Sequence, residues 1–467
     1  MNIKKVCFVC SGRNLTALSE FLPLANYLQK SNLKPFFIID GEPKKEVLDK
    51  ILKKNLKYYI NKNKESQLKT EKKKQKKNNR SVKNLKTLIP IRLRKVLKEN
   101  YELLNLIIKL NNDRKIISHV LLLEKPTVII VPGDRGIGKN LMSIRFAKSK
   151  NIKVLYLQVA ANNIDFLYTS HREKNSSYNA NIGIANKVFA KFYPDQVRKF
   201  SNKEILFYRW HEMIALILFN TLPVRPWFNG DSYADKSLFI STNDMIEDKS
   251  KGAICANASV VGQFSHDALF RIKSKKVEQK KYFQKKYFSS SSGHKSIIIF
   301  SLPQFYEHNI YSKTRSMDEI NLIIDNLSNL KSHHVFISLH PKMDFKNYEY
   351  INKLYKNIQI IKERLSEALP VADYFISVFE STISWALLCN VIPIFLDYYK
   401  LNFDLKKFDS CQIFKKKTQF NEDFQKIIDN RKILSLHLQK DNESLPPFDG
   451  NSGKRIFNEI AEIQDDK

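Results

Sequence analysis

Long hydrophobic runs are missing from this sequence. Its 467 residues contain no stretch of about 18 consecutive apolar residues, so the sequence predicts no membrane-spanning helix. The N-terminus, MNIKKVCFVCSGRN, passes from two lysines into a short strand and polar turn residues. It lacks the apolar stretch and the small-residue cleavage site of a signal peptide. We therefore expect a cytoplasmic protein.

Cysteine is also scarce. The chain has five cysteines, which fits a reducing compartment. Cys7 and Cys10 form a C-x-x-C pair, but residues three apart in a strand point to opposite faces. No second cysteine or histidine pair completes a metal site. We interpret these cysteines as structural and expect no metal ligands among them.

Acidic residues are outnumbered. The chain has 47 Asp and Glu against 79 Lys and Arg, a formal net charge of +32. Residues 44–98, the basic insertion, hold 21 basic and 4 acidic side chains, which gives +17. The centre of the basic insertion, KTEKKKQKKNNRSVKNLK (Lys69–Lys86), has almost no apolar residues. We expect that centre to be disordered or to form a solvated helix.

Two interpretations of the basic insertion stay open. It is either a compositional bias on a surface insertion or a contact with an anionic polymer or anionic lipid. The second interpretation would make the protein peripheral on the inner membrane. Nucleic acid is not an expected partner, because the run has neither interleaved aromatics for stacking nor a recognised binding motif.

The stretch VPGDRGIGKNLM (131–142) fits the phosphate-binding pattern G-x-x-x-x-G-K with Gly133, Gly138 and Lys139. Asn140 stands where that loop needs a Ser or Thr hydroxyl for Mg²⁺. No apolar run ending in Asp downstream of this stretch makes a convincing second metal-binding strand. We therefore disfavour a nucleoside triphosphatase and interpret the stretch as a glycine-rich turn that can face an anion.

Two series of alternating strands and helices follow the apolar periodicity. The first predicts strands ending at Ser11, Asp40, Val131 and Val159, and helices over 15–32, 91–123, 140–150 and 202–220. The second predicts strands over 295–303, 333–341, 359–362, 372–379 and 391–399, and helices over 316–330, 347–355 and 381–390. The series predict an α/β protein with two Rossmann-like, doubly wound parallel-sheet domains facing a cleft.

The domain boundaries follow from these series. We expect an N-terminal acceptor-side domain over 1–250, which contains the basic insertion 44–98. A C-terminal nucleotide-sugar-binding domain is expected over 251–450, followed by a tail over 451–467. Ligands of parallel sheets bind at the carboxyl ends of the strands, so the loops at those ends hold the candidate site residues.

Polar side chains gather after two strands of the second series. SLHPKMD (338–344) ends a strand with His340, and Lys342 follows the proline. After the strand ADYFISVF, the residues Glu380, Ser381 and Thr382 stand at a helix N-terminus, where hydroxyls and free N–H groups suit a diphosphate. A plain N-cap role for Ser381 or Thr382 is the alternative.

These motifs resemble the GT-B superfamily. The resemblance consists of a strand ending in H-P, the pattern A-D-x-x-[IV]-[ST]-x-x-x-S-[ST] and a proline-started strand, and SVVGQFSHDALF (259–270) resembles the crossover between its two domains. It is nearest to bacterial surface-polysaccharide glycosyltransferases and UDP-N-acetylglucosamine 2-epimerases. It implies that His340, Ser381 and Thr382 contact the nucleotide sugar, which is a substrate, and that neither a metal nor a cofactor is required.

The N-terminal half resembles the epimerase branch in its layout. That branch has a strand ending in G-D, a helix, and a strand leading into E-A-G, and VIIVPGDRGIGKN followed by IKVLYLQVAAN repeats it. The resemblance implies that Asp134 faces the substrate and that Arg135 contacts a phosphate or carboxylate. Gln158 replaces the epimerase glutamate, and Trp385 stands where an acidic pair is expected. Both departures favour a transferase.

A glycosyltransferase needs a general base for the acceptor hydroxyl. We favour Asp134, with Glu307 and His308 after the strand at 295–303 as the next candidates and His266 and Asp267 as outsiders. The loops expected to bind substrate include the residues Ser11, Gly12, Arg13, Gly133, Arg135, His340, Lys342, Glu380, Ser381 and Thr382.

The leading hypothesis is a glycosyltransferase that moves a sugar from a nucleotide sugar to a surface polysaccharide, such as capsule or lipopolysaccharide, or to a lipid-linked glycan. A hydrolysing UDP-N-acetylglucosamine 2-epimerase and a non-catalytic nucleotide-sugar-binding protein are the alternatives. The expected partners are the nucleotide sugar, the glycan or lipid-linked acceptor, and the anionic inner-membrane surface in one interpretation of the basic insertion.

Overall fold

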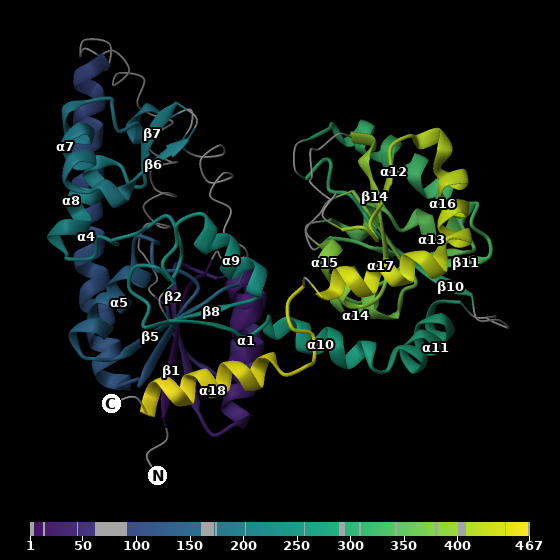
Figure 1. The fold of residues 1–467 in the computed structure, drawn as a ribbon, viewed down its shortest axis with the longest axis horizontal. Coiled ribbons are helices and arrows are strands. Elements are labelled where there is room, and N and C mark those ends of the chain that lie inside the picture. The colour runs from purple at the N-terminus through teal and green to yellow at the C-terminus, as the bar shows by residue number, and fades with distance from the viewer. Residues whose placement is uncertain are drawn as a thin grey trace, which may run out of the picture. The chain divides into compact units, whose positions relative to one another are not determined.

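The chain folds into two compact units, each built on its own parallel sheet. Unit 1 consists of Met1–Phe264 and Gly453–Lys467, and unit 2 of Ser265–Ser452 (Figure 1). The computed structural model describes residues 4–12, 15–43, 45–60, 91–159, 172, 175–200, 202–255, 257–288, 295–307, 310–340, 343–378, 382–399, 408–443 and 445–465. Two parallel-sheet domains are the architecture that the alternating strands and helices predict.

The sheet of unit 1 has seven strands in the order β3-β2-β1-β4-β5-β8-β9, and every pairing is parallel. The strands are β1 (Lys5–Ser11), β2 (Lys34–Asp40), β3 (Lys57–Ile60), β4 (Val128–Val131), β5 (Lys153–Leu157), β8 (Lys236–Phe239) and β9 (Ala258–Val260). The central strands read as continuous apolar runs such as VIIV, because helices cover both faces of the sheet.

Helices cover the two faces of this sheet with separate cores. On one face, α1 (Leu15–Lys30) and α18 (Ser452–Asp465) pack over Phe8 and Cys10 of β1. On the other face, α4 (Ile91–Glu124) and α5 (Lys139–Ser149) pack over Cys7 and Val9. Each fully buried apolar side chain contributes roughly 1.5–3 kcal/mol. The alternation of Cys7 and Cys10 between the two cores agrees with their structural interpretation.

The first part of the basic insertion is folded. Its residues form α2 (Lys45–Lys53) and the edge strand β3, whereas residues 61–90 lie outside the described part of the chain. Glu124 at the end of α4 holds β3 in place, because it pairs with Lys57 of β3 at 2.5 Å and Lys5 of β1 at 3.0 Å and accepts a hydrogen bond from Tyr59. Burial would raise the pKa of Glu124, but these hydrogen bonds outweigh it and lower the pKa to about 2.

A lobe of unit 1 lies outside its sheet. It contains α7 (Ile184–Phe192), the antiparallel hairpin of β6 (Val197–Phe200) and β7 (Lys203–Leu206), and α8 (Trp210–Leu218), and Figure 1 shows these elements together beside α4. Sequence periodicity predicts one helix over 202–220. The structure replaces its first part with β7, because Ile205 and Leu206 are buried in the aromatic core of the lobe.

Unit 2 carries a six-stranded parallel sheet in the order β12-β11-β10-β13-β14-β15. Its strands are β10 (Ser296–Ser301), β11 (His333–Ser338), β12 (Ile358–Ile360), β13 (Tyr374–Ser377), β14 (Ile392–Leu396) and β15 (Gln412–Phe414). Its helices are α10 (Phe264–Lys273), α11 (Lys276–Tyr287), α12 (Lys313–Ser328), α13 (Tyr350–Leu354), α14 (Leu365–Ala368), α15 (Ile383–Leu388), α16 (Phe420–Asp429) and α17 (Arg431–Glu443).

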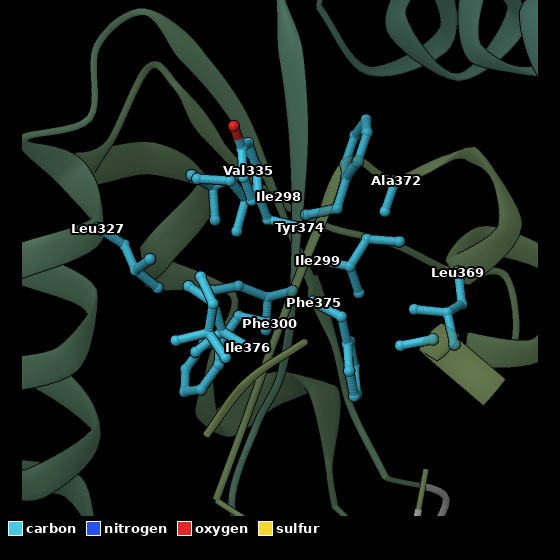
Figure 2. Close-up of a cluster of buried hydrophobic side chains, with 14 of the residues drawn as sticks. Ile298, Ile299, Phe300, Leu327, Val335, Leu369, Ala372, Tyr374, Phe375 and Ile376 are labelled. Carbon is cyan, nitrogen blue, oxygen red and sulfur yellow. The ribbon is translucent and has the colours of Figure 1, made fainter. Parts of the chain in front are cut away.

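Alternating side chains of β10 and β13 fill both faces of this sheet. Figure 2 shows Ile299 and Phe375 on the side of Leu369, whereas Phe300 and Ile376 point to the side of Leu327. A parallel strand buried on both faces is mostly apolar, which explains the apolar centres of the runs SIIIFS and YFIS.

The unit boundaries differ from the sequence prediction in two places. The junction falls at residues 264 and 265, after β9 rather than at residue 250, because β9 pairs with β8 in the sheet of unit 1. Residues 451–467 are not a separate tail. They contain α18, whose Ile456, Ile460 and Ile463 are buried in the core of unit 1.

Candidate active site

The carboxyl edge of the unit 2 sheet brings together three of the predicted site residues. Ser301 of β10 lies beside Ser338 of β11 in the parallel register, so the loops after both strands start at the same level. Glu307 follows β10 and is half-buried, His340 follows β11, and Thr382 precedes α15. The predicted site residues His308, Lys342, Glu380 and Ser381 lie outside the described residues.

Thr382 is the N-cap residue of α15, but its side chain makes no capping hydrogen bond. The hydroxyl is therefore not needed for capping, which the sequence left as the alternative. Trp385, one turn further on, is half-buried and packs against the core of unit 2. Trp385 is thus part of the packing of α15.

Asp373 belongs to the same sequence motif but lies at the start of β13, at the opposite edge of the sheet. Its carboxylate accepts a hydrogen bond from the backbone N–H of Ile297 at 2.8 Å and pairs with Lys280 at 2.6 Å and Arg431 at 3.3 Å. Burial would raise the pKa of Asp373, but these contacts outweigh it and lower the pKa. The A-D part of the motif ties β13 to β10 and α11 and is structural.

An aromatic cluster that no sequence spacing predicts stands beside these loops. Phe305 follows β10, Tyr399 follows β14, and their ring centroids are 4.6 Å apart. Arg315 in the first turn of α12 stacks 4.0 Å over the ring of Tyr311. Phe305 is fully buried, so the exposed Arg315 with Tyr311 beneath it is the part of this cluster suited to a planar, anionic ligand such as a nucleotide. Sequence alone does not identify the cluster, because Tyr399 follows β14, whereas Phe305, Tyr311 and Arg315 lie between β10 and the first turn of α12.

Glu319 of α12 fixes this cluster. It accepts a hydrogen bond from the Tyr399 hydroxyl at 3.1 Å and pairs with Lys417 at 2.5 Å. Burial and the neighbouring Glu319 raise the pKa of Tyr399, so its hydroxyl stays protonated and donates. The Tyr399 ring is therefore held by a hydrogen bond as well as by packing against Phe305.

Asp134 follows β4 in unit 1 and is buried. Its Oδ1 accepts a hydrogen bond from the Gly230 N–H at 2.8 Å, and its Oδ2 accepts from the Ser232 and Tyr233 N–H groups at 2.9 Å each. Burial raises the pKa of Asp134, and the hydrogen bonds from the backbone oppose that change. Three backbone donors occupy the carboxylate, which favours a role in holding residues 230–233; the base role stays a prediction.

Lys139, the lysine of the phosphate-loop pattern, points into the protein. Its ammonium lies 2.7 Å from Asp40 at the end of β2 and 3.4 Å from Asp113 of α4, and its side chain is buried. Gly138 has a φ of 128°, and a Cβ there would lie 2.8 Å from Asp40. The glycine and the lysine therefore close a buried ion-pair cluster, and the pattern has a structural explanation.

Arg135 is held by the lobe. Its guanidinium donates to the carbonyls of Pro226 and Trp227, at 3.3 and 2.7 Å, and lies over the ring of Phe207. The Tyr208 hydroxyl donates to the Arg135 carbonyl at 2.6 Å. Burial lowers the pKa of Arg135. The loop after β4 is thus fixed at both its carboxylate and its guanidinium.

Of the other predicted loop residues of unit 1, the structure describes Ser11, Gly12 and Gly133. Gly133 is buried beside Asn229, and Ser11 ends β1. The Gly12 N–H donates to the Asp40 carbonyl at 2.9 Å, so the first turn joins the carboxyl ends of β1 and β2. Arg13 lies outside the described residues.

Gln158 follows β5, where the epimerase resemblance expects a glutamate. It is buried, its Oε1 accepts a hydrogen bond from the Ile240 N–H at 2.8 Å, and its backbone N–H donates to the Leu238 carbonyl at 2.9 Å. These contacts tie the end of β5 to β8. An amide in this place exchanges no proton.

His266 and Asp267, the least favoured candidates for the general base, are buried in unit 2. Asp267 accepts a hydrogen bond from the Ser452 N–H at 3.0 Å, and His266 packs against Phe448. Burial lowers the pKa of His266 to about 4, which keeps the imidazole neutral near pH 7. His266 and Asp267 belong to α10, and their contacts with Phe448 and Ser452 hold the end of unit 2 against that helix.

The described residues contain neither a candidate metal site nor a helix that could span a membrane. Burial raises the pKa of Cys10 to about 12, and in the described ranges no group of three or more His, Cys, Asp or Glu side chains is placed to hold a metal ion. In the same ranges, no helix has the length and hydrophobicity needed to cross a bilayer.

Known structures match the fold of this chain over nearly its full length. No family model and no curated protein sequence matches the chain. The solved structure of UDP-GlcNAc 2-epimerase from Neisseria meningitidis bound to UDP-GlcNAc matches with a TM-score of 0.54 and 14% identity, over 98% of this chain and 100% of that one. A UDP-GlcNAc 2-epimerase from Methanocaldococcus jannaschii matches with a TM-score of 0.50 and 16% identity, over 98% and 99%.

A glycosyltransferase from Rickettsia africae ESF-5 is equally similar, with a TM-score of 0.50, 15% identity and 100% coverage of both chains. All three matches extend over nearly the full length of this chain. The chain therefore has the GT-B fold, as the short motifs of its sequence predict. At these identities the likeness concerns the fold alone.

Proposed function

We propose that the chain is a glycosyltransferase that moves a sugar from a nucleotide sugar to a surface polysaccharide or lipid-linked glycan. The GT-B fold supports a nucleotide-sugar substrate, since the similar structures include an epimerase bound to UDP-GlcNAc. The observation that carries the choice of transferase is Gln158. Its amide replaces the epimerase glutamate and cannot exchange a proton.

Unit 2 supplies the donor site in this proposal. His340 and the Ser381-Thr382 pair contact the diphosphate, and the exposed Arg315, stacked on Tyr311, contacts the base or the sugar. Charge that develops on the leaving diphosphate is stabilised by N–H donors and cations near it. Neither a metal nor a separate cofactor is part of the proposal.

Glu307 is the proposed general base. It is half-buried at the carboxyl edge of the sheet, and in the described part of the chain its carboxylate makes no hydrogen bond or ion pair. A carboxylate in this state can accept the proton of the acceptor hydroxyl. Asp134 is less suited, because its two oxygens already accept three N–H groups. His308 remains the alternative base.

A hydrolysing epimerase is the alternative function, because two of the similar structures are epimerases. The test incubates the protein with UDP-N-acetylglucosamine in the absence and presence of a glycan acceptor. The transferase predicts UDP release that depends on the acceptor. Release of free N-acetylmannosamine without acceptor would establish the epimerase and contradict the proposal.

The choice of nucleotide is tested by thermal shift. Stabilisation by UDP, CMP, GDP or CDP identifies the donor, because a ligand that binds only the folded state raises its melting temperature. A protein that binds a nucleotide sugar but turns over no acceptor would be the non-catalytic alternative. If the protein is an active transferase, Glu307→Gln should leave nucleotide binding intact and lower the turnover by about 10² or more.

Attachment to the inner membrane is part of the proposal for a lipid-linked acceptor. The basic insertion supports it, since lysines near anionic lipid each contribute on the order of 1 kcal/mol. Replacing Lys72, Lys73, Lys74, Lys76 and Lys77 by glutamine should weaken binding to anionic vesicles and leave nucleotide affinity unchanged. Equal vesicle binding at low salt by the wild type and this variant would indicate a compositional bias.

A further inference from the structure

The outer face of α7 carries an apolar stripe. Ile184, Val188 and Phe192 are spaced every four residues, so they lie one above another on one side of the helix. Their side chains are 85%, 46% and 72% exposed. The inner side of α7 is already packed, because Phe189 and Ala190 contact the core of the lobe. The stripe is therefore apolar surface beyond what the lobe needs for folding.

The stripe continues onto the end of α8. Leu218 is 64% exposed, and Ile217 and Val224 beside it are also exposed. A hollow of about 310 Å³ has Phe192 of α7 together with Ile217 and Val224 in its lining, so the two elements share one patch. The α7–α8 surface is defined as Ile184, Val188, Phe192, Ile217, Leu218 and Val224.

The charges on and just after α7 have one dominant sign. The charged residues of α7 are Lys187 and Lys191, which lie beside the stripe and are exposed. Residues 184–203 include five basic side chains and one acidic side chain, Asp195. An apolar helix face with adjacent lysines is the pattern of a helix that lies in the interface of an anionic bilayer.

The last residues of the basic insertion, 91–98, form the start of α4, which is the helix that carries the lobe. The Arg209 guanidinium at the start of α8 pairs with Glu102 of α4 at 3.1 Å, and the Trp210 indole donates to Glu99 at 3.0 Å. These contacts attach α8 to the first third of α4, whose first residue, Ile91, comes five residues after Lys86 at the end of the lysine-rich centre of the insertion. Figure 1 shows α7 and α8 beside α4.

We propose that the α7–α8 surface docks on an anionic lipid bilayer. The apolar side chains enter the boundary between headgroups and acyl chains, while Lys187 and Lys191 meet the lipid phosphates. The proposal does not depend on the glycosyltransferase activity, because it requires neither a nucleotide sugar nor an acceptor. It differs from attachment by the basic insertion in that it predicts insertion of apolar side chains.

The test measures binding of the full chain to vesicles by flotation, without nucleotide sugar. Vesicles of phosphatidylcholine with phosphatidylglycerol are compared with vesicles of phosphatidylcholine alone. The wild type should bind the anionic vesicles, and part of that binding should persist at high salt, because burial of apolar surface is not screened. The double variant Ile184→Ser/Phe192→Ser should bind more weakly by roughly tenfold for each side chain.

A matched control replaces two apolar residues of unit 2. Leu354 of α13 and Leu436 of α17 are 66% and 64% exposed, so Leu354→Ser/Leu436→Ser removes similar apolar surface elsewhere. This variant should bind vesicles as the wild type does, and both variants should melt near the wild-type temperature. Equal loss of binding in the two double variants, or no wild-type binding to anionic vesicles, overturns the proposal.

Two further variants separate the remaining interpretations. Lys187→Gln/Lys191→Gln should weaken binding to anionic vesicles at low salt and leave the salt-resistant part intact. With the five lysines of the basic insertion replaced, the salt-resistant part should also persist, and its complete loss would assign membrane binding to the insertion alone. Sedimentation velocity tests whether a second copy of the chain, rather than a bilayer, covers the α7–α8 surface. A wild-type dimer that Ile184→Ser/Phe192→Ser converts to a monomer would make the surface a self-association contact and overturn the proposal.

Discussion

Replacing Asp134 by alanine distinguishes a structural carboxylate from a catalytic base. The substitution removes the acceptor of three backbone N–H groups, which belong to Gly230, Ser232 and Tyr233. A buried donor left without an acceptor costs roughly 1–3 kcal/mol. The hydrogen bond from Gly230 is buried, whereas those from Ser232 and Tyr233 are part-buried, so water replaces some of their loss.

Relief of the buried charge acts in the opposite direction. Burial raises the pKa of Asp134, so the ionised carboxylate carries a desolvation cost that alanine removes. The net loss in the free energy of unfolding is expected to be about 2–4 kcal/mol, since at least one donor becomes fully unsatisfied. This loss is measured by urea denaturation.

Asp134→Asn is the matched variant. Its amide oxygen can still accept from one or two of the three donors, but the amide takes up no proton. A structural Asp134 predicts that asparagine recovers much of the stability lost in the alanine variant and keeps near-normal turnover. A catalytic Asp134 predicts that both variants stay within about 0.5 kcal/mol of the wild type and lose turnover by about 10² or more. That second result would refute the structural interpretation.

Three further predictions concern the donor site and two ion-pair clusters. His340→Ala and Ser381→Ala should each weaken nucleotide binding by roughly 1–3 kcal/mol in calorimetry, and unchanged affinity in both would contradict the donor-site proposal. Lys139→Met should lower the free energy of unfolding by about 3 kcal/mol, because it leaves the buried Asp113 unpaired, and adding Asp113→Asn should recover part of it. Magnesium-dependent ATP hydrolysis lost in Lys139→Met would instead support a phosphate loop. The folded-state pKa of Glu124, about 2, lies below its ordinary value of 4.5, so its stabilisation is present above pH 4.5 and is lost as pH falls toward 2. Glu124→Gln should therefore be less stable than the wild type by about 2–3 kcal/mol near pH 7 and equally stable near pH 2.

The central strands of both sheets could be predicted from sequence because they are buried on both faces, whereas β3, β8, β9 and β15 were not among the predicted strands. The run VIIV has no polar position and SIIIFS has polar residues only at its two ends, and helices between such runs are typical of a parallel α/β sheet. The hairpin of the lobe could not be predicted in the same way. Its strands β6 and β7 are four residues each, and the aromatic core that buries Ile205 is assembled from several segments of the lobe.

The candidate site was only partly predictable, for a related reason. Spacing along the chain places Lys139 in a phosphate-loop pattern, but its role depends on Asp40 and Asp113, which come from other elements. Asp134 likewise stands in a substrate-facing motif, and its partners begin 96 residues later at Gly230. Carboxylates and lysines serve binding and structure equally well, so their role follows from the partners that the fold brings to them.

The return of α18 to unit 1 has a consequence for how the chain folds during synthesis. Ile456, Ile460 and Ile463 complete the core that covers β1, yet the ribosome makes them more than 400 residues after β1. Unit 2 is contiguous from Ser265 to Ser452, so its sheet can close as soon as it emerges.

The core of unit 1 is complete only after α18 has been synthesised. Its first strands stay without their final cover while the whole of unit 2 is translated, and apolar surface exposed in that interval is open to chaperones and to misassembly. Removing the codons for α18 should therefore impair the sheet of unit 1, although the deletion lies more than 400 codons after those for β1.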